Sequence, residues 1–416
     1  MMQQKKSFSG WKLVFLALLV CIVIAGGSFA YFFMASGRSA TQHSVGNITP
    51  LATLPGTLTT VTPTTAGNVP SAATPSLAPT TRVAQTGSHR SCTLAQNGFE
   101  SGIALPSWNT DPFGDDATWH TELSQMKAQT SACWVEMPIL FTQNGGLHST
   151  QVTIGGGAAA VSSFAAGVRF ARSLGLHVFV SLLVAVNGAG SEHWVGKVTL
   201  ANYAQEQQWF ASYWQAVEPY VTAAAQAGAD QLSVGTEIQW LEDNAPATLW
   251  NSLIANMHSV FSGTLTYDVN WTALQEPLPA WLGKSDLALV GVSAYAPILN
   301  TPSRVDPSQI PGLWATKVKK PLDTFARELG KPIFISEIGY RDSRDALYNP
   351  WNITSSQPAD PQEQAAACAA VLSNTVPDQQ IFGSFFWAWD GAEQLNLKDS
   401  PQAAAAIKNY YQPLLA

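Results

Sequence analysis

From about residue 90 onward, short apolar runs rich in β-forming residues alternate with amphipathic, Ala-rich stretches. Such alternation is typical of repeated βα units. Eight runs predict strands, at 102–105, 132–139, 177–184, 231–235, 265–269, 287–293, 332–336 and 382–387. The stretches that predict helices are 118–129, 158–174, 204–227, 246–261, 313–329 and 361–375.

Eight strands with intervening helices predict an α/β fold, a closed (β/α)8 TIM barrel over residues 90–416. An open doubly wound sheet would give the same alternation locally. When that fold binds a dinucleotide, a Gly-rich phosphate fingerprint follows its first strand. The sequence after residue 105 has no such fingerprint, which favours the barrel.

The first 35 residues have the pattern of a membrane anchor. Residues 13–35 are apolar and uncharged, and Lys5, Lys6 and Lys12 precede them. A run of roughly 20 apolar residues can cross a bilayer as a helix, and its cationic flank stays cytoplasmic. We therefore expect a cytoplasmic segment at 1–12 and a transmembrane helix at 13–35, with the remainder outside the cytoplasm. The alternative is a signal peptide whose cleavage would release a secreted protein, but the apolar run exceeds the roughly 7–15 residues typical of one.

Residues 36–89 consist mainly of Thr, Pro, Ala, Ser and Gly, with few charged or aromatic residues. Such a segment cannot bury enough apolar area to offset the entropy of ordering. We predict a disordered, semi-extended stalk that holds the barrel away from the membrane.

Charge and composition narrow the class of ligand. The net charge is -7, and the chain has no Lys/Arg cluster beyond the N-terminal one, which argues against nucleic acid as a partner. Charged residues make up only 12% of the chain, whereas fifteen Trp are present. That combination suits a neutral ligand with flat apolar faces, such as a sugar.

The cysteines do not indicate a metal site, because no C-x-x-C spacing occurs, and we expect neither a metal nor a cofactor. Cys92 and Cys133 could form a disulfide if the domain is exported. The sequence does not decide whether they approach closely enough.

Two glutamates directly follow predicted strands. Glu237 ends the run Gln-Leu-Ser-Val-Gly-Thr-Glu after the fourth strand, and Glu337 ends Lys-Pro-Ile-Phe-Ile-Ser-Glu after the seventh. The C-terminal ends of all barrel strands open into one mouth. Two carboxylates about 5 Å apart can perform double displacement at an anomeric carbon, one as nucleophile and one as acid and then base. Either glutamate alone could be an N-cap or a salt-bridge partner, but the pair favours catalysis.

Several strings stand in a fixed order between Gly102 and Trp389. They are Val-Gly-Thr-Glu at 234–237, Trp250 with Leu253 and Ile254, Gly-Thr-Leu-Thr-Tyr-Asp-Val-Asn-Trp at 263–271, Gly-Val-Ser-Ala-Tyr at 291–295, Ser-Glu-Ile-Gly-Tyr-Arg at 336–341 and Gly-Ser-Phe-Phe-Trp-Ala-Trp at 383–389. In these strings the chain resembles glycoside hydrolase family 113, β-mannanase-like enzymes of the clan A barrels. The resemblance implies that Glu237 is the acid/base and Glu337 the nucleophile.

Residues at other strand ends are candidates for binding the substrate. Tyr295, after strand six, could place its hydroxyl against Glu337 and hold it ionised. Of Trp387 and Trp389, after strand eight, we expect Trp387 to form the sugar floor, since only alternate residues face inward. The bland alternative is that these aromatic residues fill the core. The other candidates are Asn270 and Trp271 after strand five, Trp108 after strand one and Trp194 after strand three. Arg341 is expected either to brace the loop after Glu337 or to orient Glu337 by charge-assisted hydrogen bonds.

Two departures from the family pattern affect the substrate more than the reaction. Most members of the clan have Asn before the acid/base, where its amide holds the sugar 2-hydroxyl, but this chain has Thr236. After strand three, a Lys-Pro-His type segment followed by an acidic residue is replaced by Ser-Leu-Leu-Val-Ala at 181–185. We therefore expect one wall of the groove to have changed.

These observations predict a membrane-tethered, retaining glycoside hydrolase that cleaves β-linked glycans, with β-1,4-mannan as the first candidate. Another β-glycan, such as a glucan or a cell-wall or capsular polysaccharide, is an alternative. A carbohydrate-binding barrel without turnover is a further alternative, although such a protein would have no need of two carboxylates that repel each other. We expect the ionised Glu337 to raise the pKa of Glu237 and keep it protonated as the reaction begins.

Overall fold

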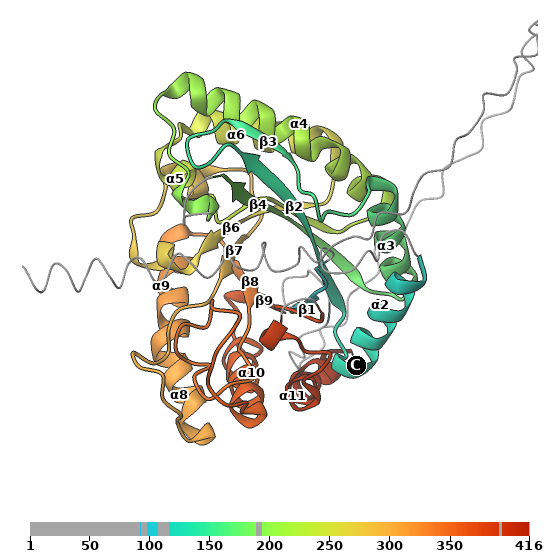
Figure 1. Ribbon diagram of the computed structural model, residues 1–416, viewed down its shortest axis with the longest axis vertical. Coiled ribbons are helices and arrows are strands. Elements are labelled where there is room, and N and C mark those ends of the chain that lie inside the picture. Colours follow the sequence, from blue (N-terminus) through green and yellow to red (C-terminus); the bar gives the residue numbers. More distant parts are fainter. Residues whose placement is uncertain (1–91, 93–97, 107–115, 189–193, 391–392, 416) are drawn as a thin grey trace, which may run out of the picture. The chain divides into compact units, whose positions relative to one another are not determined.

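The computed structural model describes residues 92, 98–106, 116–188, 194–390 and 393–415. Within them the strands surround a central axis and helices surround the strands (Figure 1). The strands are β1 (Glu100–Ala104), β2 (Trp134–Asn144), β3 (Gln151–Ile154), β4 (His177–Asn187), β5 (Gln231–Thr236), β6 (Thr264–Asn270), β7 (Val290–Ser293), β8 (Ile333–Ile338) and β9 (Ile381–Phe386).

The sheet closes on itself, because β1 pairs in parallel with β9 on one side and with β2 on the other. The remaining parallel neighbours run in the order β2, β4, β5, β6, β7, β8 and β9. The eight predicted strands correspond to these eight, so the predicted TIM barrel is confirmed, and the open sheet is excluded. The ninth strand, β3, pairs antiparallel with the long β2 outside the closed ring.

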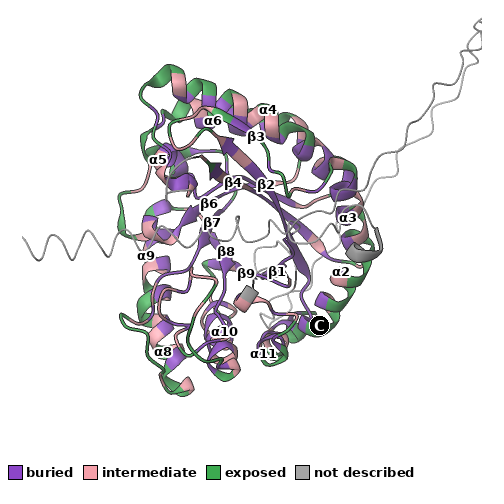
Figure 2. Ribbon diagram, viewed as in Figure 1, coloured by how far each residue is buried: buried purple, intermediate pink, exposed green. Residues whose placement is uncertain are grey.

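Helices cover the outer face of the barrel, with their buried sides toward the strands (Figure 2). They are α2 (Asp116–Thr130), α3 (Val161–Ser173), α4 (Tyr203–Ala227), α5 (Gln239–Asn244), α6 (Ala247–Val260), α7 (Ala280–Lys284), α8 (Ile310–Trp314), α9 (Lys320–Leu329), α10 (Pro361–Thr375) and α11 (Pro401–Tyr411). All six predicted helices are present. The segment 315–319 that joins α8 to α9 is π-helical, and the pattern did not predict β3, α5, α7 or α11.

The base of the barrel is filled by an aromatic plug. Its members are Trp134, Phe179, Phe334 and Phe385, packed with Leu289 and Cys133. Gly102 allows this packing, because a Cβ at that position would lie 2.1 Å from the Phe385 ring. The plug lies toward the N-terminal ends of most of these strands, opposite the C-terminal ends where barrel active sites form.

A disulfide joins Cys92 to Cys133, which directly precedes β2, with 6.1 Å between the Cα atoms. The structure thus decides a pairing that the sequence left open. The Cys92 amide also donates to the Leu414 carbonyl at 3.2 Å. Both ends of the described domain therefore meet at the base of the barrel.

The predicted N-terminal segments 1–12, 13–35 and 36–89 lie outside the described residues, and so does Trp108. Among the residues that the structure does describe, no helix has the length and hydropathy needed to cross a bilayer.

Replacing Cys92 and Cys133 together by Ser should lower the free energy of unfolding. The bond joins residues 41 positions apart and so restricts the conformations of the unfolded chain, and without it the unfolded chain gains entropy. Chain entropy alone gives about 4 kcal/mol for such a loop. Denaturant unfolding followed by tryptophan fluorescence measures the loss, and kcat should be unchanged because the bond lies at the base. As a control, a Cys368→Ala variant should still lose stability on reduction. Equal stability of the double Ser variant and the oxidised parent would contradict this account.

Candidate active site

The two glutamates lie at the ends of the fourth and seventh parallel strands, as the pattern predicts. Glu237 directly follows β5, and Glu337 lies in β8 in register with Ser293 of β7. The Glu237 backbone has φ +54°, in the left-handed region that costs a residue other than Gly of order 1–3 kcal/mol. Its amide donates to the Asp268 carbonyl at 2.8 Å, which helps to hold this turn and aims the side chain into the mouth.

Both carboxyls are nearly buried and are held by donors from neighbouring strands. The Trp194 indole nitrogen donates to Oε2 of Glu237 at 2.9 Å, and the Asn270 amide donates to Oε1 at 2.9 Å. The Tyr295 hydroxyl donates to Oε1 of Glu337 at 2.8 Å. The mouth therefore brings together five residues that the sequence analysis singled out.

Burial and mutual repulsion govern the protonation of this pair. Burial and, after it, the charge on Glu237 raise the pKa of Glu337 to about 8, although the hydrogen bond from Tyr295 lowers it. Burial also raises the pKa of Glu237, which the hydrogen bonds from Trp194 and Asn270 lower. Near neutral pH the pair therefore holds one proton. Two N–H donors face Glu237 and one hydroxyl faces Glu337, so each carboxyl can be stabilised as the charged member of the pair.

Two further acids lie in the barrel interior near this pair, and the sequence analysis missed both. Glu136 of β2 accepts a hydrogen bond from the Ser181 hydroxyl at 2.5 Å, and burial, followed by the charge on Glu337, raises its pKa well above the usual range. Burial raises the pKa of Asp268 in β6 to about 7. The available signal was their inward register, since Glu136 follows Trp134 of the plug by two residues.

The Asp268 carboxyl also explains the unusual residue before Glu237. The Thr236 hydroxyl donates to Oδ2 of Asp268 at 3.2 Å and is nearly buried. Gly291 leaves room for this acid, because a Cβ there would lie 2.1 Å from its other oxygen. Thr236 therefore binds a buried acid of the barrel interior in this structure.

Aromatic side chains form one side of the mouth. Trp387 packs with Tyr295, and Trp271, Trp351 and Leu183 border this cluster. The rings of Trp271 and Trp351 stack with centroids 5.5 Å apart. By contrast, Trp389 is fully buried in the main core, and its indole nitrogen donates to Glu122 at 2.8 Å. Sequence reasoning missed Trp351, because it lies in a loop rather than at a strand end.

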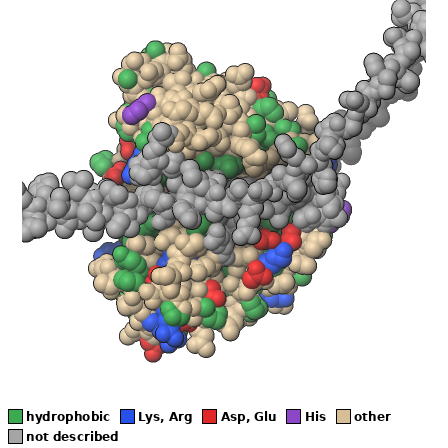
Figure 3. Space-filling view, in the orientation of Figure 1, with side chains coloured by type: hydrophobic (Ala, Val, Ile, Leu, Met, Phe, Trp, Pro, Cys, Tyr) green, Lys and Arg blue, Asp and Glu red, His purple; other side chains and the backbone are tan. Residues whose placement is uncertain are grey.

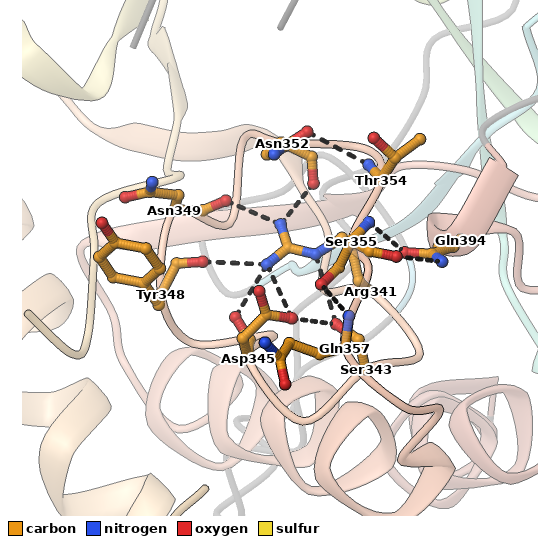
Figure 4. A network of polar contacts seen from close by, with 10 residues as sticks. All are labelled: Arg341, Ser343, Asp345, Tyr348, Asn349, Asn352, Thr354, Ser355, Gln357 and Gln394. Atoms are coloured by element: carbon orange, nitrogen blue, oxygen red, sulfur yellow. Dashed lines mark hydrogen bonds and ion pairs between the residues drawn. The ribbon is translucent and has the colours of Figure 1, made fainter. Parts of the chain in front are cut away.

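Arg341 organises the loop that carries Trp351 (Figure 4). Its guanidinium is 1% exposed and donates to the backbone carbonyls of four residues of this loop. These are Asp345, Tyr348, Asn349 and Asn352. It also forms an ion pair with the Asp345 carboxyl at 3.4 Å. Arg341 therefore acts on the mouth through the position of the 345–352 loop.

The arrangement matches a known family. The family model of Glycoside Hydrolase Family 113 matches residues 110–411. Among solved structures, a GH113 β-1,4-mannanase is similar with a TM-score of 0.62 and 20% identity, over 76% of this chain and 99% of that chain. The GH113 β-mannanase AaManA from Alicyclobacillus acidocaldarius, solved in complex with ManMIm, has a TM-score of 0.60 and 18% identity, over 76% and 98%. No curated protein matches the sequence.

The matched residues contain both glutamates, all barrel strands after the first, and the loop that Arg341 holds. The fold similarity to the two mannanase structures extends over nearly their whole length. The chain therefore belongs to glycoside hydrolase family 113 and is an O-glycosyl hydrolase of the TIM-barrel type.

Proposed function

We propose that this enzyme hydrolyses β-1,4-mannan at internal linkages of the polysaccharide, with retention of anomeric configuration. The observation that carries the proposal is the buried pair Glu237 and Glu337 at strand ends four and seven. The family match and the β-1,4-mannanase activity named for the similar structures support mannan as the first substrate to test.

In the proposed reaction, a carboxylate oxygen of Glu337 attacks the anomeric carbon while Glu237 gives its proton to the departing glycosidic oxygen. A water then attacks the glycosyl-enzyme ester as Glu237 takes a proton from it, which restores both carboxyls. Retention requires the carboxyls to be about 5–5.5 Å apart, because a larger gap would admit a water for direct attack.

The low charge of the chain suits an uncharged glycan, because charged residues make up only 12% of it. On the face drawn in Figure 3, charged side chains are few, and acidic and basic groups lie beside one another in several places. The aromatic cluster at the mouth offers ring faces to pyranose C–H groups. Leu183 borders this cluster, in the segment where the family pattern has polar residues. That change favours testing glucan and other β-glycans beside mannan.

Export to an oxidising compartment is part of the proposal, with the predicted segment at 13–35 as the anchor. The Cys92–Cys133 disulfide supports it, because such bonds persist mainly outside the cytoplasm. The full chain should remain with membranes at high salt and be released by detergent. A soluble product beginning near residue 36 would instead establish a cleaved signal peptide.

A panel of β-mannan, β-glucan and cell-wall polysaccharides tests the substrate, with new reducing ends as the readout.

Glu337→Gln should lower turnover by more than about 1,000-fold, because the nucleophile is lost. Glu237→Ala should retain activity on aryl glycosides with good leaving groups, and azide should accelerate it and yield a glycosyl azide. Retention at a β-linkage means that the newly formed reducing end is first released as the β-anomer, which proton NMR detects before mutarotation. Initial release of the α-anomer from a β-linked substrate would overturn the mechanism.

Tyr295→Phe removes one hydroxyl and keeps the ring in its cluster. A hydrogen bond to a charged group contributes about 1.5–3 kcal/mol, so kcat/KM should fall roughly 10- to 100-fold. Because the lost bond lowers the pKa of Glu337, that pKa should rise, and the acidic limb of the kcat/KM profile should move to higher pH. Trp271→Phe, which changes the same aromatic side without touching a carboxyl, is the matched control and should leave the limb in place. An unmoved limb in Tyr295→Phe would show that the hydroxyl does not tune the nucleophile.

A further inference from the structure

Ser293, the last residue of β7, lies between the strand ends that carry Glu237 and Glu337. In the parallel pairing of the barrel it stands in register with Asn270 of β6 on one side and with Glu337 of β8 on the other. Residues opposite each other on neighbouring parallel strands point to the same face, and such strands lie about 4.8 Å apart. Because Asn270 donates to Glu237 inside the mouth, the Ser293 side chain points into the same mouth.

The Ser293 hydroxyl is a buried polar group with unused hydrogen-bonding capacity. The side chain is fully buried, and its Oγ closes no hydrogen bond with the residues that the structure describes. It nevertheless faces Glu237 closely enough to lower the pKa of that carboxyl. Leaving a buried hydroxyl without a partner is costly, so this group should find one in another state of the site.

A hydroxyl can serve Glu237 in both of the protonation states that the proposed reaction requires. Glu237 carries a proton before the glycosidic bond breaks and a negative charge afterwards. The Trp194 indole and the Asn270 amide offer it N–H groups, which suit the charged form. Ser293 can accept a hydrogen bond from the protonated carboxyl and, after rotation of its hydroxyl, donate one to the ionised carboxylate.

We propose that Ser293 is a positioning residue whose hydroxyl turns to donate to Glu237 as that carboxyl loses its proton, and so stabilises the ionised acid/base. The proposal rests on the proposed role of Glu237 as acid/base. The proton moves from Glu237 to the glycosidic oxygen, and Ser293 keeps its own proton throughout. The hydroxyl therefore assists the step in which the leaving group is protonated, and it should matter little for a leaving group that departs as a stable anion.

Ser293→Ala tests the proposal through the leaving-group and pH dependence of kcat/KM. Loss of the donor should lower kcat/KM about 10-fold for mannohexaose, or for the matching oligosaccharide of whichever glycan the panel identifies. It should change kcat/KM little for the 2,4-dinitrophenyl β-glycoside of the same sugar. Because the hydroxyl lowers the pKa of Glu237, that pKa should rise and the alkaline limb should move to higher pH. An equal fall on both substrates with the limb unmoved would make Ser293 a packing residue and overturn the proposal.

The other titratable groups around Glu237 stay in place in this variant, so a displaced alkaline limb reports the lost hydroxyl. They are Asp268 of β6, Glu337 of β8, Tyr295 after β7 and Glu242 of α5. Thr266→Val is the matched control, because it removes another buried hydroxyl that has no partner among the described residues. Thr266 lies deeper in the barrel, four residues before the end of β6, and its replacement should leave the limb and kcat/KM unchanged.

Ser293→Cys is a second variant for the case that Ser293→Ala fails to fold, which its unfolding midpoint shows. A thiol is a weaker donor than a hydroxyl, so the limb should move in the same direction, and an unmoved limb would again count against the proposal. Azide rescue of Glu237→Ala separates the two proposals. If rescue succeeds and the limb of the Ser293 variant is unmoved, only the role of Ser293 is wrong, whereas failed rescue removes the acid/base assignment itself.

Discussion

Electrostatic repulsion between the buried carboxyls of Glu237 and Glu337 is the constraint on which the rest of the site depends. Two negative charges withdrawn from water cannot both persist near neutral pH unless donors compensate each of them. The structure supplies such donors from the loop after β4, from β6 and from just beyond β7. Only a closed barrel brings these strand ends to one mouth, and the aromatic plug gives that barrel a solid base on which to hold them.

The same burial sets the pH range over which the barrel is stable. Burial raises the pKa of Glu100 and Glu242 to about 8 and that of Asp268 to about 7. The folded chain therefore holds these protons more tightly than the unfolded chain does. By linkage, the free energy of unfolding falls as pH rises from the unfolded values near 4 toward 8. Mildly acidic conditions thus favour both the protonated form of Glu237 and the fold that carries it.

The repeated alternation of apolar runs and helices was sufficient to predict the closed barrel, because each strand of a parallel sheet is buried on both faces. It also located Glu237, Glu337 and Tyr295, since a strand end is a position along the chain. Sequence reasoning missed Glu136, because its inward register becomes informative only once it is known that Trp134, two residues earlier, points into the barrel. It could not predict the position of Trp351 either. That position depends on the loop whose backbone carbonyls, up to eleven residues away in sequence, accept hydrogen bonds from Arg341.

The reaction and the choice of sugar depend on different parts of this molecule. The carboxyls and their donors are attached to strands whose register is fixed by pairing around the barrel, so they tolerate little displacement. The aromatic side of the mouth includes Trp351, whose loop is held by the guanidinium of Arg341. Because Arg341 donates to backbone carbonyls of that loop, most side chains of the loop do not take part in these hydrogen bonds. Side chains there, and Leu183 on β4, can change without disturbing the pair. This separation would allow the chain to keep Glu237 and Glu337 in place while other side chains at the mouth change.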